Sequence, residues 1–394
     1  MTTIFVPREV TPGETRVAAT PETVKRLIKL GYAVVVEAGA GAGSATPDAD
    51  FTAAGATVEA GSRDAWGKAD VILKVQPPMQ HEALGAHEVD LMKQGALLIG
   101  FVWSVLAPEL SQRLRDRGVS VIAMEAIPRI SRAQKHDALS SQANLAGYKA
   151  VLMGADALKR IMPMLVTAAG TIKPARVVVM GAGVAGLQAI ATARRLGAVV
   201  EATDVRPAVK EQVESLGAKF IDVPEARAEG EGGYAKELTK EQLERQRQVV
   251  AEHLVLADMI ITTALIPGRK APVLVPADVV KRMRPGSVIV DLAVQQGGNC
   301  ELSEPGETVV REGVTIIGAL NVPALVATDA SAVYSRNLLA VVQDLTDKKA
   351  PGVIKLNLED EVIEKSLIIH AGEVRHAPTR EAVAALGQPA AASS

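Results

Sequence analysis

Three glycines and a later carboxylate have the spacing that is most specific for chemistry in this chain. Gly181, Gly183 and Gly186 form a Gly-x-Gly-x-x-Gly pattern, and Asp204 follows 18 positions after the third glycine. In this pattern the first glycine permits a tight turn, the second lets backbone N–H groups approach a pyrophosphate, and the third lets a helix pack closely on a strand. Asp204 can accept hydrogen bonds from both ribose hydroxyls of an adenosine and would repel a 2′-phosphate. The pattern therefore predicts a dinucleotide site that prefers NAD to NADP, a preference that the nearby Arg206 moderates.

The elements around these glycines are the ones that such a site requires. The run Val177–Met180 reads as a strand, an alanine-rich helical pattern follows the glycines, and a second strand pattern at Val199–Ala202 leads into Asp204. The N-terminus of the helix would face the negatively charged phosphates. Another glycine cluster at Gly39–Gly43 also follows a strand pattern, but no helical pattern comes next, which favours a plain turn.

Short β-branched runs alternate with longer helical patterns along the chain, which is typical of an α/β protein with parallel sheet. The predicted strands are Thr3–Val6, Ala33–Glu37, Val71–Val75, Ala96–Phe101 and Val119–Ala123, and then Arg176–Met180, Val199–Ala202, Lys219–Val223, Met259–Thr263, Ser287–Asp291 and Thr315–Gly318. Residues 140–162 are predicted to form one long helix that ends at Pro163 and can bridge two domains. We expect two Rossmann-like, doubly wound parallel-sheet domains separated by a cleft. The first comprises residues 1–139 and 323–394, and the dinucleotide-binding domain at 140–322 is inserted into it.

The composition excludes several classes of protein. Among 394 residues there are 43 Lys and Arg against 45 Asp and Glu, and only 3% are aromatic, so a basic, base-stacking nucleic-acid surface is not expected. The single cysteine, Cys300, excludes an internal disulfide and a multi-cysteine metal site, and no metal site is predicted. The N-terminus does not read as a signal peptide, and the longest nearly apolar run, Gly95–Ala107, is too short to cross a bilayer. We expect a soluble chain in a reducing compartment.

The whole chain resembles the alanine dehydrogenase family and, more closely, its sister family, the NAD(H)-binding component of proton-translocating transhydrogenase. Five segments carry the resemblance: Pro7–Ala18, Leu73–Pro78, the glycine pattern at 181–186, Thr263–Gly268, and Asp291–Ala293 before Gly297 and Gly298. Together they extend from residue 7 to about residue 325, and the last 60 or so residues match less distinctly.

The two families differ in the chemistry that their sites need. An amino-acid dehydrogenase needs an anchor for the substrate carboxylate and an acid/base group at the carbon that receives hydride. Arg16 and Lys74 match the family's substrate-binding residues. However, the segment that holds the catalytic His in alanine dehydrogenases contains Trp103 here, and Gln295 stands where they have the catalytic Asp. Neither side chain titrates usefully, so the acid/base chemistry is missing.

The segment Pro128–Tyr148 resembles a transhydrogenase signature known as the RQD loop. The resemblance implies that four of its side chains lie against the nicotinamide and its ribose: Arg129, Gln134, Asp137 and Ser140. Arg129 and Gln134 would steer the carboxamide, as a site must when hydride passes directly between two nicotinamides and no proton is supplied. Asp137 and Ser140 also fit a simple N-terminal cap of the long helix. The backbones of Lys135 and His136 are expected to contact the cofactor, with solvated side chains.

The resemblance assigns further contacts with NAD(H). Val184 and Gly186 would flank the pyrophosphate, and Leu265 would lie on the nicotinamide side. The adenosine ribose would contact Asp204, Val205 and Arg206. A mobile loop that begins near Pro224 would close over the cofactor, and the residues assigned to it or to its border are Gly233, Tyr234 and Gln246.

The resemblance implies a soluble NAD(H)-binding subunit that passes hydride from NADH to NADP on a partner subunit. Its expected partners are an NADP(H)-binding subunit and membrane-spanning subunits that translocate protons, and a homodimer is expected. The expected location is the cytoplasmic side of a bacterial membrane. Two alternatives remain: an alanine dehydrogenase-like enzyme with relocated acid/base residues, and a non-catalytic NAD-sensing module.

Overall fold

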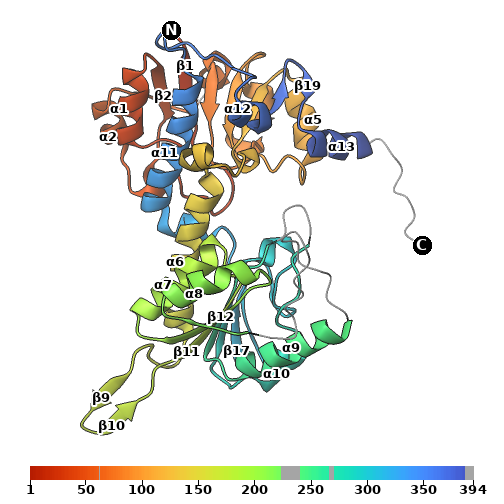
Figure 1. Ribbon diagram of the computed structural model, residues 1–394. Helices are drawn as coiled ribbons and strands as arrows, with labels where there is room; N and C mark the ends of the chain where they lie inside the picture. The colour runs from red at the N-terminus through yellow and green to blue at the C-terminus, as the bar shows by residue number, and fades with distance from the viewer. Residues whose placement is uncertain (62, 223–239, 266–269, 387–394) are drawn as a thin grey trace. The chain divides into compact units, whose positions relative to one another are not determined.

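The computed structural model describes residues 1–61, 63–222, 240–265 and 270–386 (Figure 1). The chain divides into two compact units. The first contains Met1–Gln142 and Ala324–Ser394, and the second contains Ala143–Pro323. The division falls within helix α6 (Ala138–Ala157), which therefore contributes residues to both units.

The first unit is built on a mainly parallel sheet with the strand order β19-β18-β8-β7-β4-β1-β2-β3. Its strands are β1 (Thr3–Val6), β2 (Ala33–Glu37), β3 (Thr57–Glu59), β4 (Val71–Leu73), β7 (Leu97–Gly100), β8 (Ser120–Ala123), β18 (Leu367–His370) and β19 (Glu373–Val374). The strands from β3 to β8 run parallel, and β18 and β19 add an antiparallel edge. A short antiparallel pair, β5 (Gln80–His81) and β6 (Ala86–His87), lies outside this sheet.

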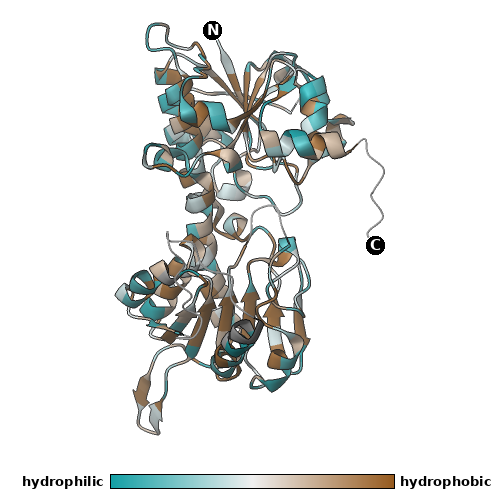
Figure 2. Cartoon of the chain, turned by 45° about the vertical axis from the view of Figure 1, so that its right-hand side comes forward, coloured by the Kyte–Doolittle hydropathy of each residue, from teal (hydrophilic) through white to brown (hydrophobic). Residues whose placement is uncertain are grey.

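Helices cover both faces of the first sheet. They are α1 (Pro21–Lys29), α2 (Asp48–Ala53), α3 (Arg63–Lys68), α4 (Glu88–Leu91), α5 (Pro108–Asp116), α11 (Ala327–Leu345), α12 (Glu361–Ser366) and α13 (Ala377–Ala385). Side chains alternate along β1, so that Ile4 and Val6 join the core with α1 and α11, whereas Phe5 joins the core with α3 and α5. Burial of both faces explains why the strands read as nearly continuous apolar runs. Figure 2 shows this as mainly brown strands beneath helices with hydrophilic faces.

The second unit repeats the same plan with the strand order β13-β12-β11-β14-β15-β17-β16. Its strands are β11 (Arg176–Met180), β12 (Val199–Thr203), β13 (Lys219–Phe220), β14 (Met259–Thr262), β15 (Val288–Asp291), β16 (Thr308–Arg311) and β17 (Val314–Ile317). All pairings are parallel except that of β16 with β17. The order reverses between β11 and β14, and ligands of such sheets bind at this switch point, outside the carboxyl ends of the strands.

Helices also cover both faces of the second sheet (Figure 1). These helices are α6, α7 (Val184–Arg195), α8 (Lys210–Ser215), α9 (Lys240–Val255) and α10 (Ala277–Arg282). Val177 and Val179 pack with α6 and α7, while Val178 and Met180 pack with α9 and α10. A hairpin of β9 (Leu165–Thr167) and β10 (Gly170–Ile172) extends away from this sheet and is exposed along its length.

The two doubly wound sheets confirm the fold class that the sequence predicts, with strand ends shifted by one or two residues. The predicted limits of the long helix are wrong. It begins at Ala138 and ends at Ala157 instead of spanning 140–162. The reason is tertiary packing: Leu158 and Met162 both enter the core of the second unit, and the Met162 carbonyl accepts the N–H of Ala175. The β9–β10 hairpin is an element that the sequence pattern does not predict.

Candidate functional site

The glycine turn of the second unit follows β11 directly and has the geometry that its sequence predicts. Gly181 has φ +98°, which favours glycine, and a Cβ on Gly186 would lie 1.8 Å from the Gly181 carbonyl oxygen. A Cβ on Gly183 would meet nothing within 4 Å, so the turn is open on that side. The first and third glycines therefore close the turn against the helix, and the second leaves its backbone accessible.

Helix α7 begins immediately after this turn. Gly183 is its N-cap, has extended backbone and offers no side chain to accept the first N–H groups of the helix. Val184, the first helical residue, is 40% exposed. Such N–H groups, together with the positive end of the helix dipole, suit an anion. The turn and the helix start thus fit the pyrophosphate of a nicotinamide dinucleotide.

Asp204 follows β12 and binds the glycine turn itself. Its Oδ2 accepts the N–H of Ala182 at 2.7 Å. Arg206 donates to the same carboxylate from its backbone N–H, its Nε and its Nη2, each at 2.9 Å. Burial would raise the pKa of Asp204, but the hydrogen bonds from Arg206 and Ala182 lower it below its ordinary value. The carboxylate is therefore charged at neutral pH, and a ribose hydroxyl would have to replace donors from Arg206, while the neighbouring Val205 is 82% exposed.

The end of β14 lies against the same turn. The hydroxyl of Thr263 donates to the Gly181 carbonyl at 3.1 Å, and its N–H donates to the Met180 carbonyl. Leu265 comes two residues later and is 48% exposed. The predicted adenosine, pyrophosphate and nicotinamide-side residues of the second unit are thus brought to one edge of one sheet.

The segment 129–140 lies in the first unit, where a 3₁₀ turn at Ser131–His136 leads into α6. Asp137 caps that helix: its Oδ1 accepts the N–H of Ser140 at 2.9 Å, and its Oδ2 accepts the Ser140 hydroxyl at 2.6 Å. The capping role that the sequence allows for these two residues is therefore what their side chains perform here. It also fixes the point at which the segment joins α6.

Ion pairs hold this segment against α11 and α12. Arg132 forms two hydrogen bonds with Asp360, at 2.6 and 2.9 Å, which lower the pKa of that carboxyl to about 2. Asp344 of α11 lies 2.7 Å from Lys135 Nζ and 3.0 Å from His136 Nε2. The prediction of a solvated His136 side chain is wrong, because the side chain is 1% exposed and its burial lowers its pKa. The Lys135 side chain is half exposed.

Arg129 and Gln134 differ from their neighbours. Both are exposed, and within the described residues no hydrogen bond or ion pair engages either side chain. A guanidinium and a carboxamide are therefore presented on a segment whose backbone is held by capping and ion pairs. Neither group changes its charge near neutral pH.

Arg16 and Lys74 lie buried in the first unit with carboxylate partners. Lys74 Nζ is 3.1 Å from Glu9 and 3.1 Å from Glu88. Glu14 forms two hydrogen bonds with the Arg16 guanidinium; although burial would raise its pKa, Arg16 lowers it to about 2. When ionised, the three carboxylates outnumber the two cations, so the cluster has no net positive charge to attract a further carboxylate.

The two positions that distinguish the sister families also have no acid/base group in the structure. Trp103 has φ +49° and stacks on Phe101 with ring centroids 5.0 Å apart. Glu125 holds this turn by accepting the N–H groups of Val102 and Ser104. Gln295 is exposed.

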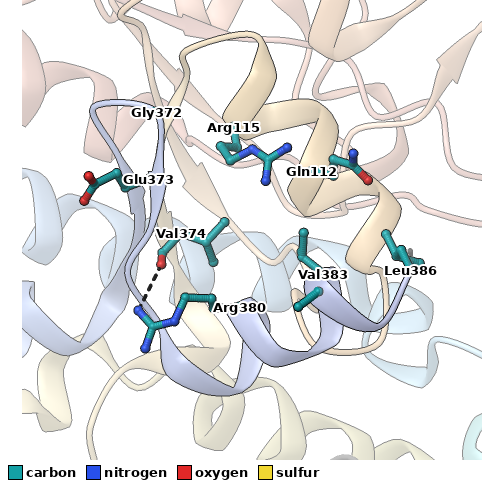
Figure 3. A pocket seen from close by; sticks show the side chains of 9 residues that line it. Gln112, Arg115, Gly372, Glu373, Val374, Arg380, Val383 and Leu386 are labelled. Carbon is teal, nitrogen blue, oxygen red and sulfur yellow. Dashed lines mark hydrogen bonds between the residues drawn. The ribbon is translucent and has the colours of Figure 1, made fainter. Parts of the chain in front are cut away.

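A surface cavity of about 740 Å³ lies in the first unit between α5, the β18–β19 turn and α13 (Figure 3). No predicted site residue lines it. Its two guanidinium groups already have partners, since Arg115 pairs with Asp116 and Arg380 donates to the Val374 carbonyl. The cavity therefore takes no part in the predicted site.

Three predicted residues cannot be placed. Gly233 and Tyr234 lie outside the described residues. Gln246 belongs to α9, but its side chain also lies outside what the structure describes. In the described part of the chain, no cluster of His, Cys, Asp and Glu could hold a metal ion.

None of the described helices is both long enough and apolar enough to span a membrane.

Two family models match the chain. The N-terminal domain of alanine dehydrogenase/PNT matches residues 5–146, and the C-terminal domain of alanine dehydrogenase/PNT matches residues 150–377.

Curated relatives and solved structures cover nearly the whole chain. The first of the parts into which the NAD(P) transhydrogenase subunit alpha of Rhodospirillum rubrum is divided is 52% identical over 376 residues, which are 95% of this chain and 97% of that protein. "Alanine dehydrogenase" of Halomonas elongata is 33% identical over 388 residues, 96% of each. The crystal structure of transhydrogenase from Sinorhizobium meliloti superposes with a TM-score of 0.85 at 47% identity, covering 94% of this chain and 99% of that chain. An L-alanine dehydrogenase structure superposes with a TM-score of 0.80 at 30% identity, covering 98% and 100%.

Proposed function

The chain belongs to the alanine dehydrogenase/PNT family, and from this premise we propose that it is the NAD(H)-binding subunit of a proton-translocating transhydrogenase. In this role it passes hydride between NADH and NADP⁺ held by a partner subunit. The family binds nicotinamide nucleotides, and the carboxylate of Asp204 at the end of β12 favours NAD(H).

The observation that carries this proposal is the contrast between the two kinds of polar site in the first unit. Arg129 and Gln134 are exposed, do not titrate and have no side-chain partner among the described residues, which suits the orientation of a ring without proton transfer. Arg16 and Lys74, which would anchor the carboxylate of an amino-acid substrate, are already paired with internal carboxylates. Direct hydride transfer between nicotinamides needs the first arrangement and not the second.

In this mechanism, NADH supplies the hydride when it is bound, and the chain supplies binding and orientation. The N–H groups of the glycine turn and the start of α7 hold the pyrophosphate. Asp204 accepts the ribose hydroxyls by exchanging donors with Arg206. Gln134 and Arg129 bind the carboxamide and thereby select which face of the ring points toward the acceptor. Asp137 and Ser140 hold the start of α6 behind them.

Alanine dehydrogenase activity is the second candidate, because a relative with that name is 33% identical over nearly the full chain. The structure disfavours it at three points. Trp103 and Gln295 supply no acid/base group, and binding a substrate carboxylate at Lys74 would place a third carboxylate on one ammonium group. A non-catalytic NAD-sensing module remains the third possibility.

The proposal includes partners. The name of the Rhodospirillum rubrum relative describes one portion of a subunit, which supports a complex of several chains. We propose an NADP(H)-binding subunit as the hydride acceptor, membrane-spanning subunits that couple transfer to proton translocation, a homodimer of this chain, and a position on the cytoplasmic side of the bacterial membrane.

Hydride exchange tests the proposal. NADH is mixed with an NADP⁺ analogue and this chain, with and without a transhydrogenase NADP(H)-binding subunit, and reduction of the analogue is followed by absorbance. Exchange that requires both proteins is expected. Turnover of pyruvate and ammonia would instead establish the dehydrogenase, and NADH binding without exchange in the reconstituted mixture would establish the sensing module.

A further inference from the structure

Asn299 is a fully buried amide whose hydrogen-bonding groups all face the backbone next to the dinucleotide site. Its Oδ1 accepts the N–H of Ala264 at 2.9 Å, and its Nδ2 donates to the Ala264 carbonyl at 2.9 Å. The second Nδ2 hydrogen goes to the Pro272 carbonyl at 2.8 Å. The side chain is 0% exposed. One amide therefore holds both backbone groups of the residue before Leu265.

A buried carboxylate fixes Asn299 in turn. Asp291, at the end of β15, is 0% exposed and accepts the N–H of Asn299 at 2.9 Å through its Oδ2. The carboxylate also accepts four further hydrogen bonds, from the Thr262 hydroxyl, the Ala293 N–H, the Cys300 N–H and the Ser303 hydroxyl. Gly298 approaches so closely that a Cβ there would lie 2.9 Å from Asp291 Oδ2. The turn that carries Asn299 is thus held by a saturated, buried acceptor.

The backbone that Asn299 holds is continuous with the glycine turn. Ala264 follows Thr263, whose hydroxyl donates to the Gly181 carbonyl. A Cβ on Gly181 would lie 2.6 Å from the same hydroxyl oxygen, so there is little room for the end of β14 to shift toward the turn. On the other side of Ala264 stands the exposed Leu265. Displacement of Ala264 would therefore move the residue assigned to the nicotinamide side.

We propose that Asn299 is a positioning residue for hydride transfer, which sets the place of Leu265 by clamping both backbone groups of Ala264. The inference rests on the proposed function. Asn299 acts through Ala264 and touches no part of the dinucleotide, so it should matter for the pose of the nicotinamide and little for affinity. Most of the affinity should come from the glycine turn and Asp204.

The test compares Asn299→Ala with Ser287→Ala. Ser287 is a matched control: it is 3% exposed, and its hydroxyl donates to the Ala257 carbonyl at 3.2 Å, at the amino end of the same sheet. Three quantities are measured on each protein: equilibrium NADH binding by the isolated chain, stopped-flow hydride transfer with the NADP(H)-binding subunit, and amide hydrogen exchange of Ala264. If Asn299→Ala does not fold, Asn299→Ser is used, which keeps one polar group of the clamp.

We expect transfer by Asn299→Ala to fall by on the order of a hundredfold, the effect of a misplacement of about 1 Å. NADH affinity should change far less, and the Ala264 amide should exchange faster because it has lost its acceptor. Ser287→Ala should change neither transfer nor this exchange. Equal losses of affinity and rate, an unchanged rate, or the same rate loss in Ser287→Ala would overturn the inference while wild-type transfer upholds the proposed function. A wild-type chain that transfers no hydride would refute both.

Discussion

Replacement of Asp204 by Asn should narrow the preference for NADH over NADPH. Asn has nearly the same shape and keeps one oxygen that can accept the N–H of Ala182, so the glycine turn should retain its anchor. What is lost is the negative charge, and with it the repulsion of a 2′-phosphate. Arg206, released from its ion pair, becomes available to bind that phosphate.

The size of the effect follows from the contacts of the carboxylate. Hydrogen bonds to a charged group contribute about 1.5–3 kcal/mol each. A ribose hydroxyl gains less than this at Asp204, because it replaces a donor from Arg206 instead of filling an empty position. We therefore expect NADH to bind about 1–2 kcal/mol more weakly, or about 5–30-fold in Kd, with NADPH binding more tightly than before.

Equilibrium titrations of NADH and NADPH with the isolated chain measure both changes. Asp258→Asn is the control, since Asp258 is also a largely buried carboxylate, which accepts hydrogen bonds from Arg160 and from the N–H of Arg176 at the amino end of the same sheet. That variant should keep the wild-type ratio of affinities. An unchanged ratio in Asp204→Asn would refute the assignment of Asp204 to the adenosine ribose.

Three further predictions concern the first unit. Gln134→Asn should slow hydride transfer by on the order of a hundredfold while NADH affinity changes little, measured by stopped flow beside equilibrium titration; equal losses would mean that Gln134 only binds. Arg132→Gln breaks an exposed ion pair with Asp360 and should cost less than about 1 kcal/mol in urea unfolding, yet it should slow transfer because the segment loses a clamp; a wild-type rate would contradict this. The pKa of Glu14 is about 2 when folded and 4.5 ordinarily, so its stabilising contribution is complete above pH 4.5 and is lost as the pH falls toward 2. Unfolding free energies measured against pH should show a shallower acid slope in Glu14→Gln, and an identical slope would refute the prediction.

The parts of the site that could be predicted from the sequence are those whose determinants lie close together in the chain. The turn at Gly181 needs a positive φ, and Gly186 needs the absence of a side chain, so both leave a local record in the sequence. The cap formed by Asp137 and Ser140 spans three positions and is visible in the sequence for the same reason. The pattern of buried strands likewise records that both faces of each sheet are covered.

The parts that could not be predicted depend on contacts between distant segments. Asn299 and Ala264 are 35 positions apart, and nothing in either local pattern indicates that they meet. The burial of His136 results from its packing beside Asp344 of α11, more than 200 positions later. The only signal near Asn299 is the glycine pair before it, which indicates a tight turn but not its neighbour. Helix α6 ends early for a similar reason, because tertiary burial decides where Leu158 lies.

The protonation states of these groups are consistent with a reaction that moves hydride and no proton. A general acid or base works best when its pKa lies near the operating pH. Arg129 stays charged and Gln134 stays neutral across that range, so neither can exchange a proton with the substrate. Their contribution must come from where they lie, which explains why the structure devotes a helix cap and the ion pairs of Arg132 and Lys135 to the segment that carries them. In the second unit the clamp by Asn299 has the same character, since a neutral amide fixes a backbone position without titrating.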